Sequence, residues 1–291
     1  MNNEEKIKND TKEGTQKTKL LSPKLDVVFQ ALFGEEGSER ITKEFLEAIL
    51  ERKIEEVDLS GNIVLRRENV EDKMGVLDVL AKINDKEYIN VEMQVYNKKN
   101  LLERILYYWA KIYTRNIKKK EDYIELKKTI EVLIVDFEIK QLKELGYHSK
   151  WKIIEEKDRK LILTDDLEIH IIEINKIKNL TEKEKNKELV KWIYFLEEPD
   201  GERVKGYMKN DNGIKEAKGK LETMSEDERM QILADLRLKA IMDEKAVRRL
   251  GYKEGKEEGK KEIAKKMKEK GTDIKYIKEI TGLTEEEIEK L

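Results

Sequence analysis

The sequence predicts an α/β fold in which a mixed sheet is flanked by helices and followed by a helical C-terminal module. Residues 20–199 alternate between amphipathic helical segments and short apolar runs that are typical of strands. The chain has only two prolines, Pro23 and Pro199, whereas loop-rich all-β chains usually have prolines throughout. After Pro199 the sequence becomes rich in Lys and Glu with a helical pattern. These three observations together favour a helix-rich mixed fold.

The chain divides into three parts by composition. Residues 1–19 are polar and predict a disordered tail, because they offer almost nothing apolar to bury. Residues 20–199 predict the folded α/β domain. Residues 200–291 predict a charged helical C-terminal region. A chain of 291 residues is long enough for one large domain or two small ones.

Apolar spacing predicts the individual elements. Two helices are expected first, with Ser22 and Pro23 at the start of the first and Gly34 at its end. The predicted helices of the α/β domain are 24–33, 38–52, 98–118 and 181–198. The predicted strands are 63–69, 76–83, 87–95, 129–137 and 167–174. The last stretch, 263–291, predicts three short helices broken at Gly271 and Gly282.

Composition excludes several classes of function. There is no cysteine, so disulfide frameworks, thiolate metal sites and cysteine nucleophiles are excluded, and a cytoplasmic location is expected. No segment is apolar enough to span a membrane, and the N-terminus lacks the apolar core of a secretory signal. The net charge of −2 gives no support for nucleic-acid binding, which must rest on local patches. His148 and His170 are isolated in sequence and are interpreted as structural or surface residues.

The runs 76–83 and 87–95, separated by three polar residues, predict a β-hairpin. With Ile83 opposite Glu87, Asp78 lies directly across from Glu92. Gln94 then shares the face of Glu92, because side chains alternate along a strand. The opposite face is apolar in this register, and a slip of one residue would separate the two acids.

Two interpretations of this polar face remain open. Asp78, Asn90, Glu92 and Gln94 could be the solvated face of an amphipathic hairpin. Alternatively, the opposed carboxylates of Asp78 and Glu92 hold a hard divalent cation, Mg²⁺ or Mn²⁺, which offsets their repulsion. Such an ion can activate water and stabilise charge on a phosphoryl oxygen.

A resemblance to a known family favours the second interpretation. Asp78 followed by Glu92-Met93-Gln94 resembles the Asp…(Asp/Glu)-x-Lys signature of PD-(D/E)XK nucleases. The ordered segments 21–29, 77–82, 91–94 and 104–109 are similar to the Rpn family, the recombination-promoting nucleases also described as PD-(D/E)XK nuclease family transposases. The resemblance covers about residues 20–200. It implies a restriction-endonuclease-like fold and a Mg²⁺-dependent endodeoxyribonuclease.

The resemblance assigns roles to individual residues. Asp78 and Glu92 would be the metal ligands, and Gln94 would take the place of the superfamily lysine as a catalytic residue. Glutamine forms only neutral hydrogen bonds and cannot act as a general base near neutral pH. The Rpn-like group commonly has glutamine at this position, so the replacement does not imply inactivity. The proton acceptor therefore stays open.

Three further residues are expected to support the site. Arg104 and Tyr108 match a polar-x-x-x-Tyr motif on the helix after the hairpin and could brace the site or touch phosphate. The alternative is an exposed arginine beside a core tyrosine. Asp26 lies in a matching segment and could be a third acid near the metal or a helix-surface residue.

Local charge indicates where DNA would be held. Residues 98–128 contain ten basic and four acidic side chains, directly after the metal motif. By contrast, the segment Thr284–Leu291 is rich in glutamate, which phosphates would repel. The C-terminal region is therefore interpreted as a partner-binding or self-association module rather than a DNA-reading helix-turn-helix, and homo-oligomers could form through it.

The favoured function is a metal-dependent DNA endonuclease connected with recombination, mobile elements or defence against foreign DNA. The alternative is a catalytically inactive DNA-binding or oligomeric interaction protein that keeps the nuclease fold.

Overall fold

The computed structural model describes residues 19–60, 78–97, 100–118 and 120–291. Contacts divide the chain into two units after Ala234. The first unit extends beyond Pro199, because α8 packs against α2 and α6. The N-terminal tail and the predicted strand 63–69 lie outside the described residues.

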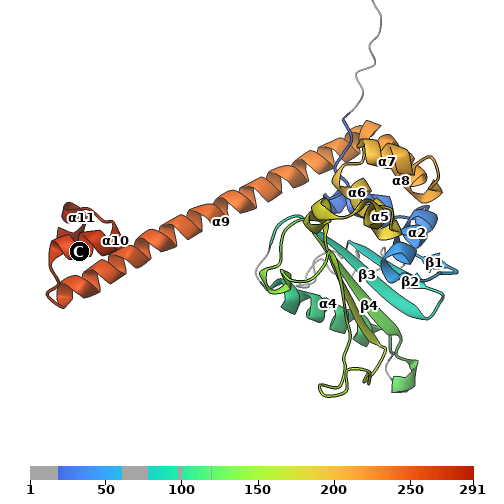
Figure 1. Ribbon diagram of the computed structural model, residues 1–291, viewed down its shortest axis with the longest axis horizontal. Coiled ribbons are helices and arrows are strands. Elements are labelled where there is room, and N and C mark those ends of the chain that lie inside the picture. Colours follow the sequence, from blue (N-terminus) through green and yellow to red (C-terminus); the bar gives the residue numbers. More distant parts are fainter. Residues whose placement is uncertain (1–18, 61–77, 98–99, 119) are drawn as a thin grey trace, which may run out of the picture. The chain divides into compact units, whose positions relative to one another are not determined.

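Within the described part of the first unit, six strands form one mixed sheet in the order β1-β2-β3-β4-β6-β5 (Figure 1). Its strands are β1 Val57–Asp58, β2 Val79–Ile83, β3 Glu87–Gln94, β4 Lys128–Val135, β5 His148–Trp151 and β6 Leu167–Glu173. β3, β4 and β6 run parallel, and the remaining neighbours are antiparallel. The predicted strands at the hairpin, 129–137 and 167–174 are thereby confirmed to within three residues at each end.

Helices cover both faces of the sheet. The first unit contains α1 Asp26–Phe33, α2 Glu39–Leu50, α4 Leu101–Arg115, α5 Glu182–Lys185, α6 Glu188–Glu197, α7 Glu202–Tyr207 and α8 Asn212–Glu226, with 3-10 turns η1 Tyr123–Glu125, η2 Lys140–Leu142 and η3 Ile174–Asn179. α4 lies against one face, and α2, α5 and α6 gather on the other side (Figure 1). The segment 181–198 forms two helices rather than the single predicted one, since Asn186 and Lys187 interrupt it.

The start of the first helix differs from the prediction. The N-cap of α1 is Leu25, and no side chain caps it. Ser22 instead closes a turn before the helix, in which its carbonyl accepts the backbone N–H of Leu25 at 3.1 Å. Proline fixes the backbone of the turn as readily as that of a helix, so the Ser-Pro pattern alone did not decide between them.

The core on the side of α1, α2 and α6 is aromatic. Phe29, Phe33, Phe45 and Trp192 are almost completely buried. Phe33 and Phe45 stack with their ring centroids 4.6 Å apart, and Trp192 lies 5.3 Å from Phe45. Such pairs stabilise the fold beyond the area they bury. These rings pack α1, α2 and α6 against one another and thereby hold the end of α1 that contacts the hairpin.

The second unit is formed by the end of a long helix and two short ones. α9, Glu228–Glu269, begins in the first unit, and α10 Ile274–Thr281 and α11 Glu285–Glu289 follow it. Gly271 and Gly282 adopt positive φ angles of 75° and 69°, which glycine tolerates without strain, so both predicted helix breaks are confirmed. Ala264, Ile277, Leu283 and Ile288 form a small core. No helix in the described residues is both long and apolar enough to cross a membrane.

Candidate active site

The hairpin has the predicted register. Val79 pairs with Val91, and Ile83 pairs with Glu87 at the turn. Continuing this register by one residue brings Asp78 opposite Glu92. The carboxylate of Asp78 accepts the backbone N–H of Met93 at 2.7 Å, which ties it to β3 between Glu92 and Gln94. The sheet therefore brings Asp78, Glu92 and Gln94 together at one end of the hairpin.

The face that carries Glu92 is covered rather than solvated. Asn90 is completely buried and Glu92 is 6% exposed. α4 packs over this face, with Tyr108 and Ile112 against Leu80 of β2. Asn90 and Glu92 are therefore not part of a wet hairpin face, whereas Asp78 and Gln94 are half-buried. Burial of a carboxylate is costly unless other groups compensate it, so Glu92 needs a specific partner.

Arg104 is one such partner. Its guanidinium donates to the Tyr108 hydroxyl at 3.2 Å and lies 5.5 Å from the centre of the Tyr108 ring. Burial by itself would lower the pKa of Arg104, but the Tyr108 hydroxyl and the charges of Tyr108 and Glu92 outweigh it and raise the pKa. Arg104 thus stays cationic beside Glu92, and the buried Tyr108 holds it in place.

A buried polar pair on the same face was not anticipated from the sequence. Asn90 and Glu131 are neighbours across β3 and β4, and the Asn90 amide donates to Glu131 at 2.7 Å. Burial and the charge of Glu92 raise the pKa of Glu131 well above its usual value, although the Asn90 hydrogen bond opposes this. The signal in the sequence was a single glutamate inside the apolar run Thr129–Val135. Such a residue either has a buried partner or ends the strand.

Gln94 ends β3 beside a lysine that the sequence analysis did not single out. The Gln94 carbonyl accepts the backbone N–H of Asp136 at 3.0 Å. The Asp136 carboxylate accepts from Lys24 at 2.7 Å, and Glu197 lies 3.3 Å from the same ammonium. Burial lowers the pKa of Lys24, but these two acids outweigh it and raise the pKa overall. Lys24, just before α1, thus joins the segment after β4 to the end of α6.

Asp26 begins α1, and its proximity to the metal stays a prediction. Its carboxylate accepts the backbone N–H of Val27 at 2.9 Å. The opposite end of the helix contacts the hairpin: a Cβ on Gly34 would lie 3.1 Å from the Asp78 carbonyl. Eight helical residues span about 12 Å. The role of Asp26 as a third acid near the metal or as a helix-surface residue therefore stays open.

The donor set fits a hard divalent cation. Asp78 and Glu92 offer carboxylate oxygens and Gln94 an amide oxygen, all of them ligand types that Mg²⁺ and Mn²⁺ accept. Among the described residues, no three His, Cys, Asp or Glu side chains are grouped so as to hold a metal ion by themselves. Mg²⁺ commonly uses one or two carboxylates and takes water and substrate phosphate as its other ligands. The two carboxylates of Asp78 and Glu92 are therefore enough protein ligands for one Mg²⁺ ion.

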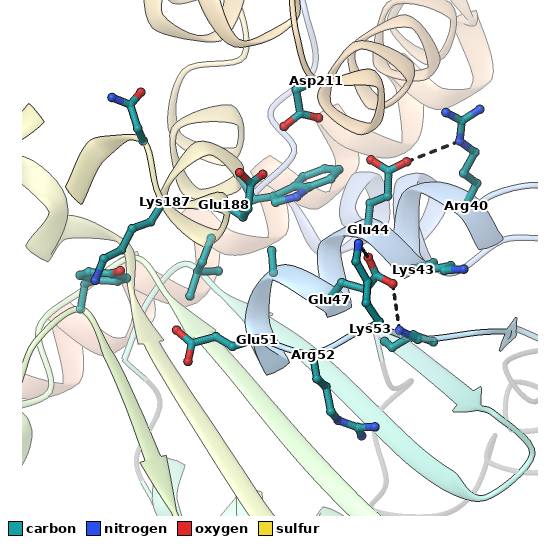
Figure 2. A pocket seen from close by; sticks show the side chains of 16 residues that line it. Arg40, Lys43, Glu44, Glu47, Glu51, Arg52, Lys53, Lys187, Glu188 and Asp211 are labelled. Atoms are coloured by element: carbon teal, nitrogen blue, oxygen red, sulfur yellow. Dashed lines mark hydrogen bonds and ion pairs between the residues drawn. The ribbon is translucent and has the colours of Figure 1, made fainter. Parts of the chain in front are cut away.

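A surface hollow elsewhere has a different character. An open hollow of about 1100 Å³ lies over α2 and α6 (Figure 2). Its charges are largely paired, with Lys53 2.9 Å from Glu47 and Arg40 3.5 Å from Glu44. None of the predicted site residues lines it. The predicted site is thus separate from this hollow.

The two histidines, isolated in sequence, are neighbours in space. β5, which the sequence analysis missed, pairs with β6 and places His148 Nε2 2.8 Å from His170 Nδ1. His170 Nε2 lies 2.8 Å from the carboxylate of Glu168. Burial, followed by the charges of His170 and Lys150, lowers the pKa of His148 to about 4.

The lowered pKa of His148 should make the stability of the folded chain depend on pH. The unfolded chain binds a proton at His148 near pH 6.5, whereas the folded chain does so near pH 4. The stability that neutral His148 contributes is fully present above pH 6.5 and is lost as the pH falls toward 4. We expect His148→Gln to remove about 2 kcal/mol of this pH dependence, a figure reduced for partial exposure. Urea denaturation between pH 4 and 7 measures it, and equal slopes for both proteins would contradict it.

The expectation that the C-terminal region is not a helix-turn-helix is wrong. Residues 257–291 match the C-terminal HTH domain of the Rpn/YhgA-like nuclease family, although the glutamates of α11 had argued against a helix-turn-helix. Glu287 completes a capping box with Thr284, and Glu285 pairs with Lys278 at 2.9 Å. The apolar positions and the Gly282 turn determine this fold. The exposed charges affect only what the helix can bind.

The larger match covers most of the chain. No curated protein and no solved structure matches the sequence. Residues 23–250 match the PD-(D/E)XK nuclease family transposases, a span that includes the whole sheet and every residue of the predicted site. A mixed sheet flanked by helices, with an acidic hairpin at its centre, is the fold expected for that family. The chain belongs to the PD-(D/E)XK nuclease family transposases.

Proposed function

We propose that the protein is a metal-dependent DNA endonuclease that hydrolyses phosphodiester bonds. The observation that carries this proposal is the hairpin register that brings Asp78 opposite Glu92, beside the Met93-Gln94 pair, in a chain of a nuclease family. By the family resemblance, cleavage would serve recombination, mobile elements or defence against foreign DNA. A cytoplasmic location, as the absence of cysteine suggests, is compatible with DNA as the substrate.

Asp78 and Glu92 would hold Mg²⁺, or Mn²⁺ in its place. When bound, the ion supplies an activated water and stabilises charge on the phosphoryl oxygen. The hydrogen bond from Met93 N–H fixes the Asp78 carboxylate against β3. Gln94 would orient water or phosphate through neutral hydrogen bonds. Arg104, held by Tyr108, would balance the charge of Glu92.

A nicking assay tests the proposal. Supercoiled plasmid is incubated with the full chain in MgCl₂, in MnCl₂ and in EDTA. We expect open-circular and linear products with either metal and none in EDTA. Uncut plasmid under all three conditions, with protein that remains folded, would reject the endonuclease assignment.

The alternative is an inactive DNA-binding or oligomeric protein on the same fold, and the match of residues 257–291 to a C-terminal HTH domain is the observation that favours it. Metal binding separates the two. We expect Mn²⁺ to raise the melting temperature of the wild type by several degrees, because an ion that binds only the folded state stabilises it. This shift should disappear in Glu92→Gln. DNA binding without a metal response would favour the alternative, in which the C-terminal helices mediate homo-oligomerisation.

A further inference from the structure

A basic hollow lies at the edge of the sheet, beside the chain segment that joins β5 to β6. Ile154 and Ile162 pair across this segment in an antiparallel bridge, so it forms a hairpin. The hollow has a volume of about 650 Å³. Its lining contains four cationic residues and two isoleucines, but no acid: Lys150, Lys152, Arg159, Lys160, Ile154 and Ile162. It is called the hairpin hollow below.

The acids beside the hairpin hollow do not balance its lysines. The buried carboxylate of Glu168 lies 2.6 Å from Lys150, 2.9 Å from Lys128 and 3.8 Å from Lys152. A second acid, Asp165, lies 2.8 Å from Lys152. Three ammonium groups therefore share two carboxylates, and positive charge remains in excess.

Arg159 and Lys160 add two more positive charges. Both are exposed, and within the part of the chain that the structure describes neither side chain has an ion pair or a hydrogen bond. Two acids of the same turn are used by its backbone. The Glu155 carboxylate accepts the N–H of Lys157 at 2.8 Å, and the Asp158 carboxylate accepts the N–H of Lys160 at 3.0 Å. The donors of Arg159 and Lys160 are therefore available for an anion.

The hairpin hollow is separate from the candidate active site. Lys150 pairs with His170, which lies level with Val132 of β4 and thereby with Val91 of β3. Neighbours across a sheet share a face and successive residues alternate, so Lys150 lies on the face opposite that of Glu92. Two further strands, β4 and β6, lie between β3 and β5. A group bound in the hollow therefore does not contact the predicted metal ligands.

Size and composition indicate what the hairpin hollow can hold. Its excess of cations favours phosphate, and its volume suits a ligand of about the size of a nucleotide. Ile154 and Ile162 add apolar surface, against which a base or sugar can pack. A duplex keeps its bases stacked inside, whereas a single strand can present base and phosphate together. Both features of the hollow are used only by a single strand.

We propose that the hairpin hollow binds a single-stranded DNA segment through its phosphates, as an accessory site outside the active site. The choice of DNA rests on the proposed function, whereas the excess of positive charge does not. Phosphate contacts carry no sequence information and release counterions. Binding in the hollow is therefore independent of DNA sequence and strongly dependent on salt.

The test uses the full chain in EDTA and a fluorescent oligothymidylate of about eight nucleotides. Without a cation the acidic pair repels phosphate, and a helix-turn-helix docks on duplex DNA, so both other sites contribute little. Fluorescence anisotropy gives the association constant at several NaCl concentrations. The double variant Arg159→Gln/Lys160→Gln should make the slope of log K against log salt shallower by about 1.4. At 0.1 M salt its affinity should fall roughly twentyfold.

A matched control separates contacts in the hollow from net charge. Lys157 is exposed in the same turn but does not line the hollow, and Lys209 is exposed outside the hairpin. The double variant Lys157→Gln/Lys209→Gln changes the net charge equally and should keep the wild-type slope. Both double variants replace exposed side chains, so their melting temperatures should equal that of the wild type.

Competition identifies the class of ligand. Unlabelled oligothymidylate should displace the probe, and polyglutamate of equal charge should not. The inference would be overturned by an absence of binding, by an unchanged slope in the Arg159/Lys160 variant, or by an equal change in the control. Displacement by polyglutamate as effective as by DNA would also overturn it, because the hollow would then accept acidic protein chains.

Failure of the proposed function gives a different result. In that case the wild type binds the oligothymidylate with the expected slope and loses it in the Arg159/Lys160 variant, but does not cut plasmid in Mg²⁺. A wild type that cuts plasmid, together with an Arg159/Lys160 variant that binds the probe normally, would reject the accessory site alone.

Discussion

Asp78→Ala is expected to lower divalent-dependent DNA cleavage by at least about a thousandfold, equivalent to about 4 kcal/mol of transition-state stabilisation. The variant removes one of the two carboxylates that would hold the ion. It also removes the acceptor of the Met93 N–H, so Gln94 would lose its fixed position relative to Glu92. Initial rates of plasmid nicking, measured across a range of MgCl₂ concentrations, quantify the loss.

Asp78→Asn separates metal binding from this structural contact. The asparagine carbonyl can still accept the Met93 N–H, but it is a neutral and weaker ligand for Mg²⁺. We expect nearly wild-type melting temperature in EDTA, a strongly reduced rate, and partial recovery at high Mn²⁺. Full activity of Asp78→Asn at low Mg²⁺ would show that Asp78 does not hold the ion.

Glu131→Gln is expected to stabilise the metal-free protein at neutral pH. The pKa of Glu131 is raised in the folded chain. Below pH 4.5 the residue is protonated in both the folded and the unfolded chain, so it does not lower the free energy of unfolding there. As the pH rises above 4.5, the unfolded chain ionises first and the folded state loses stability until its own pKa is passed. Glutamine cannot ionise and can still accept the Asn90 amide. We expect a gain of about 1–3 kcal/mol near pH 7.5 that vanishes near pH 4.5.

Chemical denaturation in EDTA at pH 4.5, 6 and 7.5 measures this gain. Glu168→Gln is the contrast, because Glu168 is also buried but lies 2.9 Å from Lys128 and 2.6 Å from Lys150. Burial opposes ionisation of Glu168, but His170 and the two lysines lower its pKa well below the usual value. Its glutamine variant should therefore lose stability at neutral pH. A Glu131→Gln protein less stable than the wild type at every pH would contradict the prediction.

The hairpin was predictable because its pattern is local. Val79, Ala81 and Ile83 share one face of β2, and a three-residue turn leaves one register that buries a continuous apolar surface. That register determines which acid lies opposite Asp78, so the pairing with Glu92 followed from the sequence. Helices α1 and α2 were predictable for the same reason, since each presents a periodic apolar stripe.

Contacts distant in sequence were not predictable in this way. β5 has the polar sequence HSKW and forms only because β6 supplies its hydrogen-bond partners. The same pairing brings together His148 and His170, which are 22 positions apart. A strand with so few apolar residues gives no periodic signal, and its edge position depends on the rest of the sheet.

The sequence by itself determined the acidic pair of the candidate site and the neighbouring pair Val79 and Val91, because strand alternation and turn length are local properties. The tertiary structure alone decided the environment of that pair. α4 packs on Leu80 of β2 and supplies Arg104, while β4 lies parallel to β3 and brings Glu131 against Asn90. Burial and charge balance depend on which distant elements cover a residue. The acids Asp78 and Glu92 could therefore be named from the sequence, but their desolvation and their cationic partner could not.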